Sequence, residues 1–466
     1  MRRVMQLDMK TGLRRLAVII MMIVVAAAGE SRAVAQSAPR SAPQLIRDAE
    51  IEGLMRLYTR PVFKAAGLNP RSVSVYLIND PRINAFVSGG QRIFIHTGLL
   101  MQAKTPNEVI GVLAHETGHI AGGHLARMGV ELDRASTTSI IGMLVGIAAM
   151  AGGAASGNSD AMRAGSGVVI GSQGLAQRSF LAYQRSMEAS ADQAALRYLN
   201  ATGQSAKGMI TLFDKLAHES IASLQNVDPY VLSHPMPFDR IRNLELAAKK
   251  SPNYNEQDGP ALMLRHQLMQ AKLSGFIESP QLVMRRYPSS DTSLPARYAR
   301  AIALFRRGDI QNALPVIESL IRDLPQDPYF FELKGQALLE NGRPAEAIAP
   351  LRQAVKMLPR NGLIQILMAQ ALIGTEKPGD AKEAIKLLRQ AQRSEPDTPA
   401  VFSFMAMAYG RLGDVARAEL ATAEAALLRG DRKLAVDKAK SAQSRFKTGS
   451  PEWTRANDIL TFASRK

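Results

Sequence analysis

The sequence of 466 residues has no cysteine, and only 5% of its residues are aromatic. Without cysteine the chain can form no disulfide and cannot carry a lipid on an N-terminal cysteine, so packing must supply its stability. The scarcity of aromatic rings leaves few surfaces on which bases can stack, which argues against a nucleic-acid partner. Long apolar runs are also scarce: one lies near the N-terminus, at residues 16–28, and one internal candidate lies at residues 139–155.

The first 35 residues have the pattern of a secretory signal peptide. Residues 1–15 carry five basic side chains, residues 16–28 are apolar, and Ala33-Val34-Ala35 offers a small-x-small cleavage site. An uncleaved anchor is the alternative, but the apolar run is shorter than the roughly 20 residues that a membrane span needs. We therefore expect export, followed by a disordered leader over residues 36–45, which are rich in Ser, Ala and Pro.

The chain is strongly basic, with a formal net charge of +17. Loss of residues 1–35 removes six basic and two acidic side chains, which leaves +13. Such a charge favours contact with anionic lipid surfaces or acidic partners, although a simply solvated basic surface is the alternative.

The pentapeptide His115-Glu116-Thr117-Gly118-His119 carries the strongest chemical signal. Consecutive residues are about 100° apart around a helix, so His115 and His119 point to the same side. Two such imidazoles form a zinc-binding pair, and Glu116 lies beside them, where it can accept a proton from metal-bound water. The alternative is a helix with two incidental histidines. Because the chain has only seven histidines, we favour a hydrolytic site with one Zn²⁺ per chain.

A catalytic zinc takes three protein ligands and leaves one position for water or substrate. One known solution is a histidine six residues after the second, but that position is Leu125. His124 lies about 140° from His119 around a continuous helix and can share the metal only if Gly122 and Gly123 break the helix. We favour for His124 a hydrogen bond to a carboxylate or a backbone carbonyl.

A glutamate on a later helix is the other solution, and Glu131, Glu188 and Glu219 are the candidates. Glu188 is favoured because Glu188-Ala-Ser-Ala-Asp192 places two carboxylates one turn apart. In this interpretation Glu188 binds the metal, and Asp192 accepts a hydrogen bond from the far nitrogen of a ligand histidine. A solvated acidic helix face is the alternative.

Local patterns place the pentapeptide on a helix beside a small sheet. Residues from about 48 to 66 form an amphipathic helix, and three short strands follow, at residues 73–78, 84–88 and 92–96, with Gly89-Gly90 as a tight turn. Thr105-Pro106-Asn107-Glu108 is a helix start, with a capping-box pair and proline at the first position. We expect this helix to continue through His119.

Residues 45–250 resemble the zinc metallopeptidases of the CAAX prenyl protease and HtpX type, within the glutamate-ligand zincins. The resemblance rests on the order and spacing of Asn84-Ala85-Phe86, the HETGH motif continuing to His124, Glu188-x-x-x-Asp192, His234-Pro235 and Arg240-Ile241. It implies that His115, His119 and Glu188 are the zinc ligands and that Glu116 is the general base.

His234 precedes a proline, so it can approach the metal from a loop. It either stabilises the oxyanion during turnover or occupies the open zinc position and keeps the enzyme latent. A histidine that merely caps a helix is the third interpretation. Arg240 pairs with Asp192 or with a substrate carbonyl, and an ordinary surface arginine is the alternative.

Residues 139–178 form an apolar hairpin between the two metal-binding helices. The run at residues 139–155 is short for a membrane span and is dominated by Ala and Gly. The hairpin therefore dips into a membrane surface, covers the active site, or is buried in the core of the peptidase.

From about residue 260 the chain becomes helical and repetitive. Alanines and prolines recur at intervals of 34 or 37 residues, at Ala313, Ala347, Ala384 and Ala418 and at Pro325, Pro359 and Pro396. This is tetratricopeptide periodicity, with an insertion at residues 376–378 in a turn, a degenerate first unit around Gly275 and a cap after Gly430. Such arrays bind peptides or partner proteins and do no chemistry themselves.

These observations predict a mainly α protein: a zincin-like α+β metallopeptidase domain with a small sheet over residues 46–255, followed by an all-α tetratricopeptide solenoid over residues 256–466. The combination resembles periplasmic proteases of outer-membrane quality control. It implies a periplasmic endopeptidase, free or peripheral on a membrane, that degrades misassembled outer-membrane proteins. The array would dock these substrates or the β-barrel assembly machinery, and the substrate would add as a strand along residues 84–88. The alternative is a chaperone or adaptor whose protease site is latent.

Overall fold

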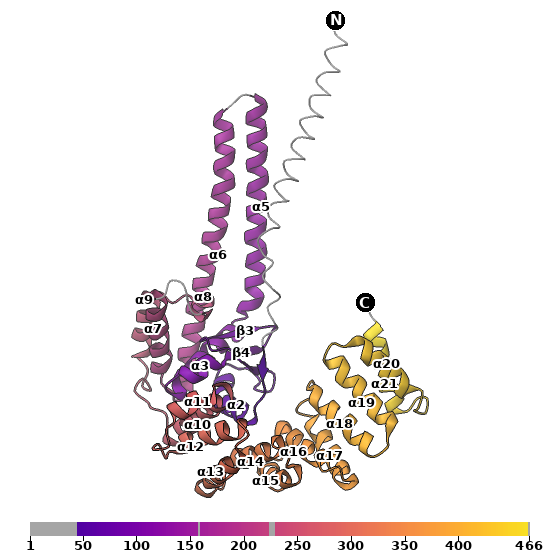
Figure 1. Ribbon diagram of the computed structural model, residues 1–466. Coiled ribbons are helices and arrows are strands. Elements are labelled where there is room, and N and C mark those ends of the chain that lie inside the picture. Colours follow the sequence, from indigo (N-terminus) through magenta and orange to yellow (C-terminus); the bar gives the residue numbers. More distant parts are fainter. Residues whose placement is uncertain (1–43, 157–158, 223–228, 465–466) are drawn as a thin grey trace. The chain divides into compact units, whose positions relative to one another are not determined.

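A computed structural model describes residues 44–156, 159–222 and 229–464. The predicted signal peptide and residues 36–43 of the predicted leader lie outside the described residues. Within residues 45–464, a domain that combines a small sheet with helices is followed by an array of helices (Figure 1). The predicted fold class, mainly α with one small sheet, is therefore confirmed.

The sheet has four short strands in the order β1-β2-β4-β3. Strands β2 (Ser74–Ile78) and β4 (Arg92–His96) are parallel, and β3 (Ala85–Ser88) is antiparallel to β4. The two glycines of the predicted tight turn, Gly89 and Gly90, have φ values of 57° and 96°, which residues with a Cβ rarely adopt. Strand β1 (Leu45–Ile46) pairs with β2 and was not predicted, because two residues are too few to show alternation. The predicted leader therefore ends before Leu45.

The helix that carries the pentapeptide is α4 (Pro106–Ala121), and its start follows the predicted signals. Thr105 caps the helix by accepting a hydrogen bond from the backbone nitrogen of Glu108 at 3.3 Å, and Pro106 is at the first position. The Glu108 carboxylate in turn accepts a hydrogen bond from the backbone nitrogen of Lys104 at 2.7 Å. Strand β3, at the edge of the sheet, lies next to α4.

Seven further helices complete this domain. They are α2 (Ala49–Ala65), α3 (Thr97–Gln102), α5 (His124–Ser156), α6 (Ser159–Ala201), α7 (Lys207–Ala222), α8 (Pro229–Ser233) and α9 (Phe238–Ala248). Buried side chains of α2, the strands, α4, the C-terminal part of α6, α7 and α9 form one hydrophobic core.

Helices α5 and α6 form a long hairpin in which the two helices run side by side (Figure 1). The predicted apolar segment, residues 139–178, is the outer part of this hairpin. Several large apolar side chains there are exposed, including Leu144 and Ile147, so the interpretation that the segment is buried in the peptidase core is wrong. Among the described residues, no helix is long and apolar enough to cross a membrane.

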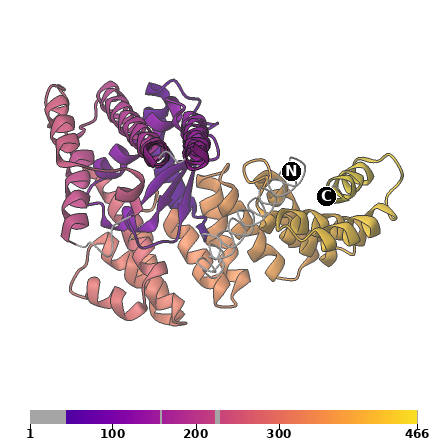
Figure 2. The ribbon, with the colours of Figure 1, turned by 90° about the horizontal axis from the view of Figure 1, so that it is seen from above.

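The helical array continues from α10 to α21 in successive antiparallel pairs (Figure 2). Its helices are α10 (Pro260–Ile277), α11 (Pro280–Arg286), α12 (Leu294–Arg306), α13 (Ile310–Asp323), α14 (Pro328–Glu340), α15 (Pro344–Met357), α16 (Gly362–Gly374), α17 (Pro378–Ala391), α18 (Pro399–Arg411), α19 (Val415–Leu428), α20 (Arg432–Gln443) and α21 (Pro451–Ser464). The repeating alanines Ala313, Ala347 and Ala384 are fully buried between paired helices. Residues 376 and 377 of the predicted insertion lie in the connection between α16 and α17, and Pro378 is the first residue of α17.

Helix α10 joins the two parts because its two faces pack on different cores. Met269 and Leu273 belong to the core of the N-terminal domain, whereas Leu268 and Ala271 belong to the first core of the array. His266 on the same helix contacts the backbone oxygen of Ala103 through Nε2 at 2.9 Å. The sequence periodicity that identified the repeats does not reveal this second role of α10.

Candidate metal centre

Helix α4 presents both histidines of the pentapeptide to one buried point. His115 is fully buried and His119 is 6% exposed, and their Nε2 atoms lie 3.0 Å apart. The glycine between them permits α6 to approach closely, because a Cβ on Gly118 would lie 2.9 Å from the backbone oxygen of Ala191. The pentapeptide therefore sets both the facing of the histidines and the distance to the next helix.

Helix α6 brings Glu188 and Asp192 to the two histidines. The Glu188 carboxylate lies 3.3 Å from Nε2 of His115 and 3.4 Å from Nε2 of His119. One turn further, Asp192 Oδ1 lies 3.0 Å from Nδ1 of His115, on the far side of that ring. A carboxylate at this position fixes the orientation and the tautomer of a metal-binding imidazole. Of the other candidate ligands, Glu131 pairs instead with Arg134 at 2.7 Å, and the side chain of Glu219 lies outside the described residues.

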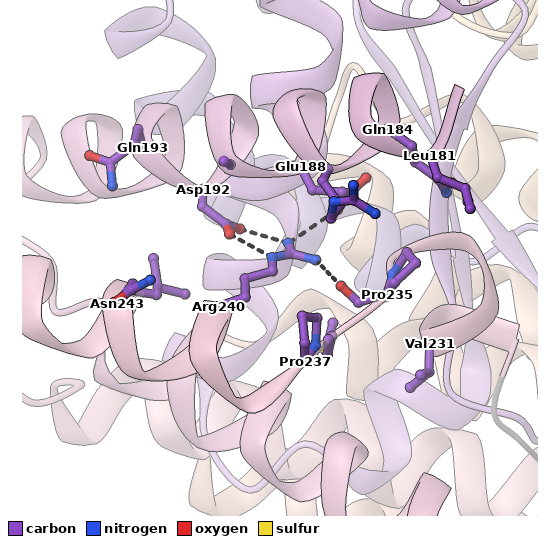
Figure 3. Close-up of a pocket in the computed structure, with 14 residues that line it drawn as sticks. Leu181, Gln184, Glu188, Asp192, Gln193, Val231, Pro235, Pro237, Arg240 and Asn243 are labelled. Carbon is purple, nitrogen blue, oxygen red and sulfur yellow. Dashed lines mark hydrogen bonds and ion pairs between the residues drawn. The ribbon is translucent and has the colours of Figure 1, made fainter. Parts of the chain in front are cut away.

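His234 and Arg240 come from the segment that contains α8 and α9. His234 follows α8, is 6% exposed, and places Nδ1 at 3.0 Å from Glu188 Oε2. Arg240 donates two hydrogen bonds to Asp192, at 2.7 and 2.8 Å, and one to the backbone oxygen of Pro235 at 2.7 Å (Figure 3). Arg240 thus links the carboxylate behind His115 to the loop that carries His234.

Four side chains together offer a ligand set for a metal ion. His115, His119, Glu188 and His234 each provide one ligand atom, and these atoms all lie within 4.8 Å of one another. Imidazole nitrogens and a carboxylate oxygen are the ligands that zinc takes in catalytic sites. Both oxygens of Glu116 are fully buried without a hydrogen-bond partner among the described residues, and its Oε1 lies 3.4 Å from His234 Nε2. A buried carboxylate in this condition fits a site that also takes an ion and its water.

In this site, burial and close contacts between charged groups shift the pKa values of side chains in opposite directions. Burial raises the pKa of the Glu188 carboxyl, but contacts with His115 and His234 outweigh this and hold the pKa well below its usual range. Burial, together with neighbouring His115, lowers the pKa of His119 to about 2. Burial lowers the pKa of His115, but contacts with Asp192 and Glu188 outweigh this and raise it to about 9. Glu188 and His119 thus have the protonation states that metal ligands need, whereas His115 must lose a proton to bind a metal.

His124 has a different partner from the one that we favoured. The helix does break after Ala121, Gly123 has a φ of 63°, and His124 begins α5. Its Nδ1 contacts Nδ1 of His119 at 3.0 Å, so the partner is the ring of a candidate ligand rather than a carboxylate or a carbonyl. Among the described residues, His124 is not in the four-residue ligand group.

Among the described residues, the sequence analysis missed the contacts of Phe213, whose ring lies 5.7 Å from that of His115, and of Tyr230. The buried ring of Tyr230 lies 4.6 Å from that of His234, centroid to centroid, and Tyr230 is one helical turn before His234 on α8. The i and i+4 spacing of Tyr230 and His234 was the available signal, but α8 has only five residues and showed no periodicity.

A cavity of about 700 Å³ opens beside the carboxylates of α6. Glu188, Asp192 and Arg240 line one side of it, and Leu181 and Pro237 contribute apolar surface (Figure 3). The candidate metal centre is thus adjacent to a space that can receive a side chain of a bound polypeptide.

Comparison with known proteins gives the same division of the chain. Residues 48–248 match the model of Peptidase family M48, and residues 298–361 and 338–407 match models of the tetratricopeptide repeat. These matches cover strands β2 to β4, the metal centre and the middle of the helical array.

Two curated relatives match over most of this chain, and a third matches over part of it. Proteins named Beta-barrel assembly-enhancing protease from Yersinia pestis and from Escherichia coli (strain K12) are 26% and 23% identical, in each case over 82% of this chain and 76% of the relative. Metalloprotease LoiP from Escherichia coli (strain K12) is 32% identical over 37% of this chain and 62% of the relative. The sequence, the site and these similarities together show a metallopeptidase with a Peptidase family M48 domain, followed by tetratricopeptide repeats.

Proposed function

We propose that the protein is a zinc-dependent endopeptidase whose metal ligands are His115, His119 and Glu188. The observation that carries the proposal is the convergence of these buried groups beside Glu116, whose carboxylate has no described hydrogen-bond partner. A bound zinc would polarise the scissile carbonyl and lower the pKa of a water molecule. Glu116 accepts the proton of that water and passes it to the leaving amine.

Two further residues hold this arrangement in place. Asp192 keeps the ring of His115 oriented through the 3.0 Å contact at Nδ1. Arg240 neutralises Asp192 and contacts Glu188 at 3.1 Å, so two buried carboxylates share one guanidinium.

His234 is, in this proposal, the group that keeps the site latent. One of its ring nitrogens belongs to the group of four ligand atoms, so it takes the fourth position, where water or substrate would have to bind. Turnover then requires the loop after α8 to move. Replacement His234→Ala would raise peptidase activity if this role is right, and would lower it if His234 instead stabilises the oxyanion.

The substrate is proposed to add as a strand along β3. This strand is at the edge of the sheet and lies next to α4, so a peptide paired with it would run past the metal centre. Backbone pairing supplies affinity with little sequence preference, as degradation of varied polypeptides requires.

We further propose that the protein is exported to the periplasm, where it degrades misassembled outer-membrane proteins and supports β-barrel assembly. The predicted signal peptide and the names of the two similar proteases support this role. The helical array would dock the substrates or the β-barrel assembly machinery, since arrays of this kind bind polypeptides along their surface.

Metal analysis is the direct test of the enzymatic proposal. The purified protein should hold about one zinc per chain, and His115→Ala should lose it. His218→Ala is the matched control, because His218 is exposed on α7 and should leave the zinc content unchanged. An absence of zinc from the parent protein, or equal loss in both variants, would sink the proposal.

The second candidate function is a chaperone or adaptor whose protease site stays closed. The contact of His234 with Glu188 favours it, because this contact closes the site. Cells that carry Glu116→Gln separate the two functions. If the variant supports barrel assembly as well as the parent while client degradation stops, the array carries the assembly role by itself.

A further inference from the structure

The outer part of the α5–α6 hairpin exposes large apolar side chains to solvent. Ile141, Leu144, Val145 and Ile147 are 50 to 61% exposed. Ile141, Leu144 and Val145 lie on one face of α5, because positions i, i+3 and i+4 of a helix share a face. Val168 on α6 is also exposed. Exposed apolar side chains in such a concentration mark a surface that is covered by something else.

Charged side chains are nearly absent from the same stretch of chain. Between residues 135 and 177 the sequence has only two charged residues, Asp160 and Arg163. This segment therefore lacks the charged face that a helix exposed to water usually has.

Four arginines lie where this charge-poor segment ends. Arg134 is 22 residues before the end of α5 at Ser156, and Arg178 is 19 residues after the start of α6 at Ser159. Because the two helices run antiparallel, these two residues lie at a similar level of the hairpin. Arg127 and Arg185 form a second such pair, seven residues or about two turns nearer to the metal centre.

All four arginines are exposed, and two carboxylates accompany them. Glu131 bonds to Arg134 at 2.7 Å, and Asp133 is the other acidic residue of this part of α5. The four arginines and two acidic residues together carry a net positive charge, and they lie next to the apolar segment on the side nearer to the metal centre. This sequence of layers, apolar and then basic, is complementary to the hydrocarbon and the anionic headgroups of a lipid surface.

We propose that the outer part of the hairpin docks into an anionic lipid surface, up to the level of the four arginines, without crossing it. The consequence for the enzyme rests on the proposed peptidase function. Arg185 precedes Glu188 by three residues, which is about 4.5 Å of rise along a helix. The metal centre is then held about one helical turn from the headgroups, and its substrates are polypeptide segments that lie at the surface of that membrane.

Flotation with lipid vesicles tests the proposal. The purified protein should float with vesicles of one part phosphatidylglycerol to three parts phosphatidylcholine, and much less with pure phosphatidylcholine or at high salt. The variant I141S/L144S should bind the anionic vesicles roughly tenfold or more weakly, because each apolar side chain contributes its transfer from water to lipid. The variant R127Q/R178Q should lose the preference for anionic lipid.

Two matched variants control for a general change of surface. Leu246→Ser removes an apolar side chain of similar exposure on α9, and Arg360→Gln removes an exposed arginine of the array. Neither should change vesicle binding. The proposal is overturned if the parent protein does not float, or if the control variants bind as weakly as the hairpin variants.

A second copy of the chain is the competing occupant of this surface. If I141S/L144S abolishes a dimer of the parent protein and leaves flotation unchanged, the hairpin joins two chains and the lipid proposal is wrong. Cleavage of a water-soluble peptide without vesicles is measured in parallel, and the hairpin variants should cleave it as the parent does. If the hairpin variants lose flotation but still cleave the peptide, the hairpin acts in docking and not in catalysis. If the parent protein does not cleave the peptide, the peptidase proposal fails, whatever the flotation result.

Discussion

Among the described residues, two clusters of buried charge differ in the groups that they gather. In the metal centre, His115, His119 and Glu188 converge, and Glu116 beside them has no described hydrogen-bond partner. In the second cluster, at the junction of α2, α10 and α14, Lys272 is 2% exposed and lies 2.8 Å from Asp48, 3.3 Å from Glu50 and 3.6 Å from Glu332.

Both clusters contain a cation, since Arg240 lies 3.1 Å from Glu188 in the metal centre, and the difference lies in the other groups that they gather. The junction cluster contains its own cation, and the Tyr298 hydroxyl donates a further hydrogen bond to Glu50 at 2.7 Å. The metal centre gathers nitrogen and oxygen atoms that accept an ion. Burial of charge is therefore common to a structural joint and to a reactive site, and the kind of group that is gathered tells them apart.

The largest expected effect comes from Glu116→Gln, which breaks the reactive cluster only. Peptide cleavage should fall by about 10³-fold, because the amide can no longer accept the proton of the attacking water. Zinc content and thermal unfolding should stay close to those of the parent protein, since Glu116 is not among the ligand atoms. Steady-state cleavage of a fluorogenic peptide measures the loss, and a variant with full activity would contradict the assignment of the base.

Next in size is Lys272→Met, which breaks the junction cluster only. The unfolding free energy should fall by about 3 kcal/mol at pH 8, because buried carboxylates lose their cation. Denaturation monitored by circular dichroism measures the change. Lys249→Met is the control, because this exposed lysine pairs with Glu245 on the surface of α9 and should matter little.

The loss caused by Lys272→Met should be smaller at pH 5. Burial raises the pKa of Glu50 to about 7, against the lowering effect of Lys272, and it raises the pKa of Glu332 as well. Glutamates with a raised folded-state pKa contribute stability that is present at low pH and is lost as pH rises through about 7. Protonated Glu50 and Glu332 need no cation at pH 5. An equal loss at both pH values would contradict this explanation of the junction.

The third largest effect, that of Asp192→Asn, tests how Asp192 contributes to metal binding. The substitution keeps the size of the side chain but removes the charge that faces Nδ1 of His115, so zinc affinity should fall by about 10- to 100-fold. Competition with a fluorescent zinc chelator measures the affinity. Asp239→Asn, on the exposed surface of α9, is the control. Unchanged affinity in Asp192→Asn would show that Asp192 pairs with Arg240 for structural reasons alone.

The smallest effect tests the packing between paired helices of the array. A Cβ on Gly335 would lie 2.3 Å from Cγ of the buried Leu351, so Gly335→Ala should destabilise the protein by about 1 kcal/mol. Gly410→Ala is the control, since that glycine is exposed near the end of α18 with open space around it and should gain about 0.5 kcal/mol. Chemical denaturation compares the two, and equal shifts would mean that packing at Gly335 is loose.

The sequence was most informative where a local rule applied. The capped start of α4, the turn at Gly89 and Gly90, and the repeat spacing of the array each depend on a few neighbouring residues, and the structure contains all three. Such features are set by backbone conformation and side-chain periodicity, which a sequence displays directly.

What the sequence could not show was the pairing of distant elements. Nothing in the neighbourhood of Lys272 predicts that carboxylates of α2 and α14 surround it, and the contact of His124 with His119 depends on a helix break whose direction is a tertiary matter. Strand β1 was missed for the same reason, since its two residues acquire their conformation by pairing with β2.

A crystal structure of the zinc-loaded protein, with anomalous diffraction recorded at the zinc edge, tests the central claim most directly. The account predicts one strong peak per chain, bonded to Nε2 of His115, Nε2 of His119 and a carboxylate oxygen of Glu188, with Glu116 outside the ligand sphere. A peak at another site, or zinc bound without Glu188, would contradict it.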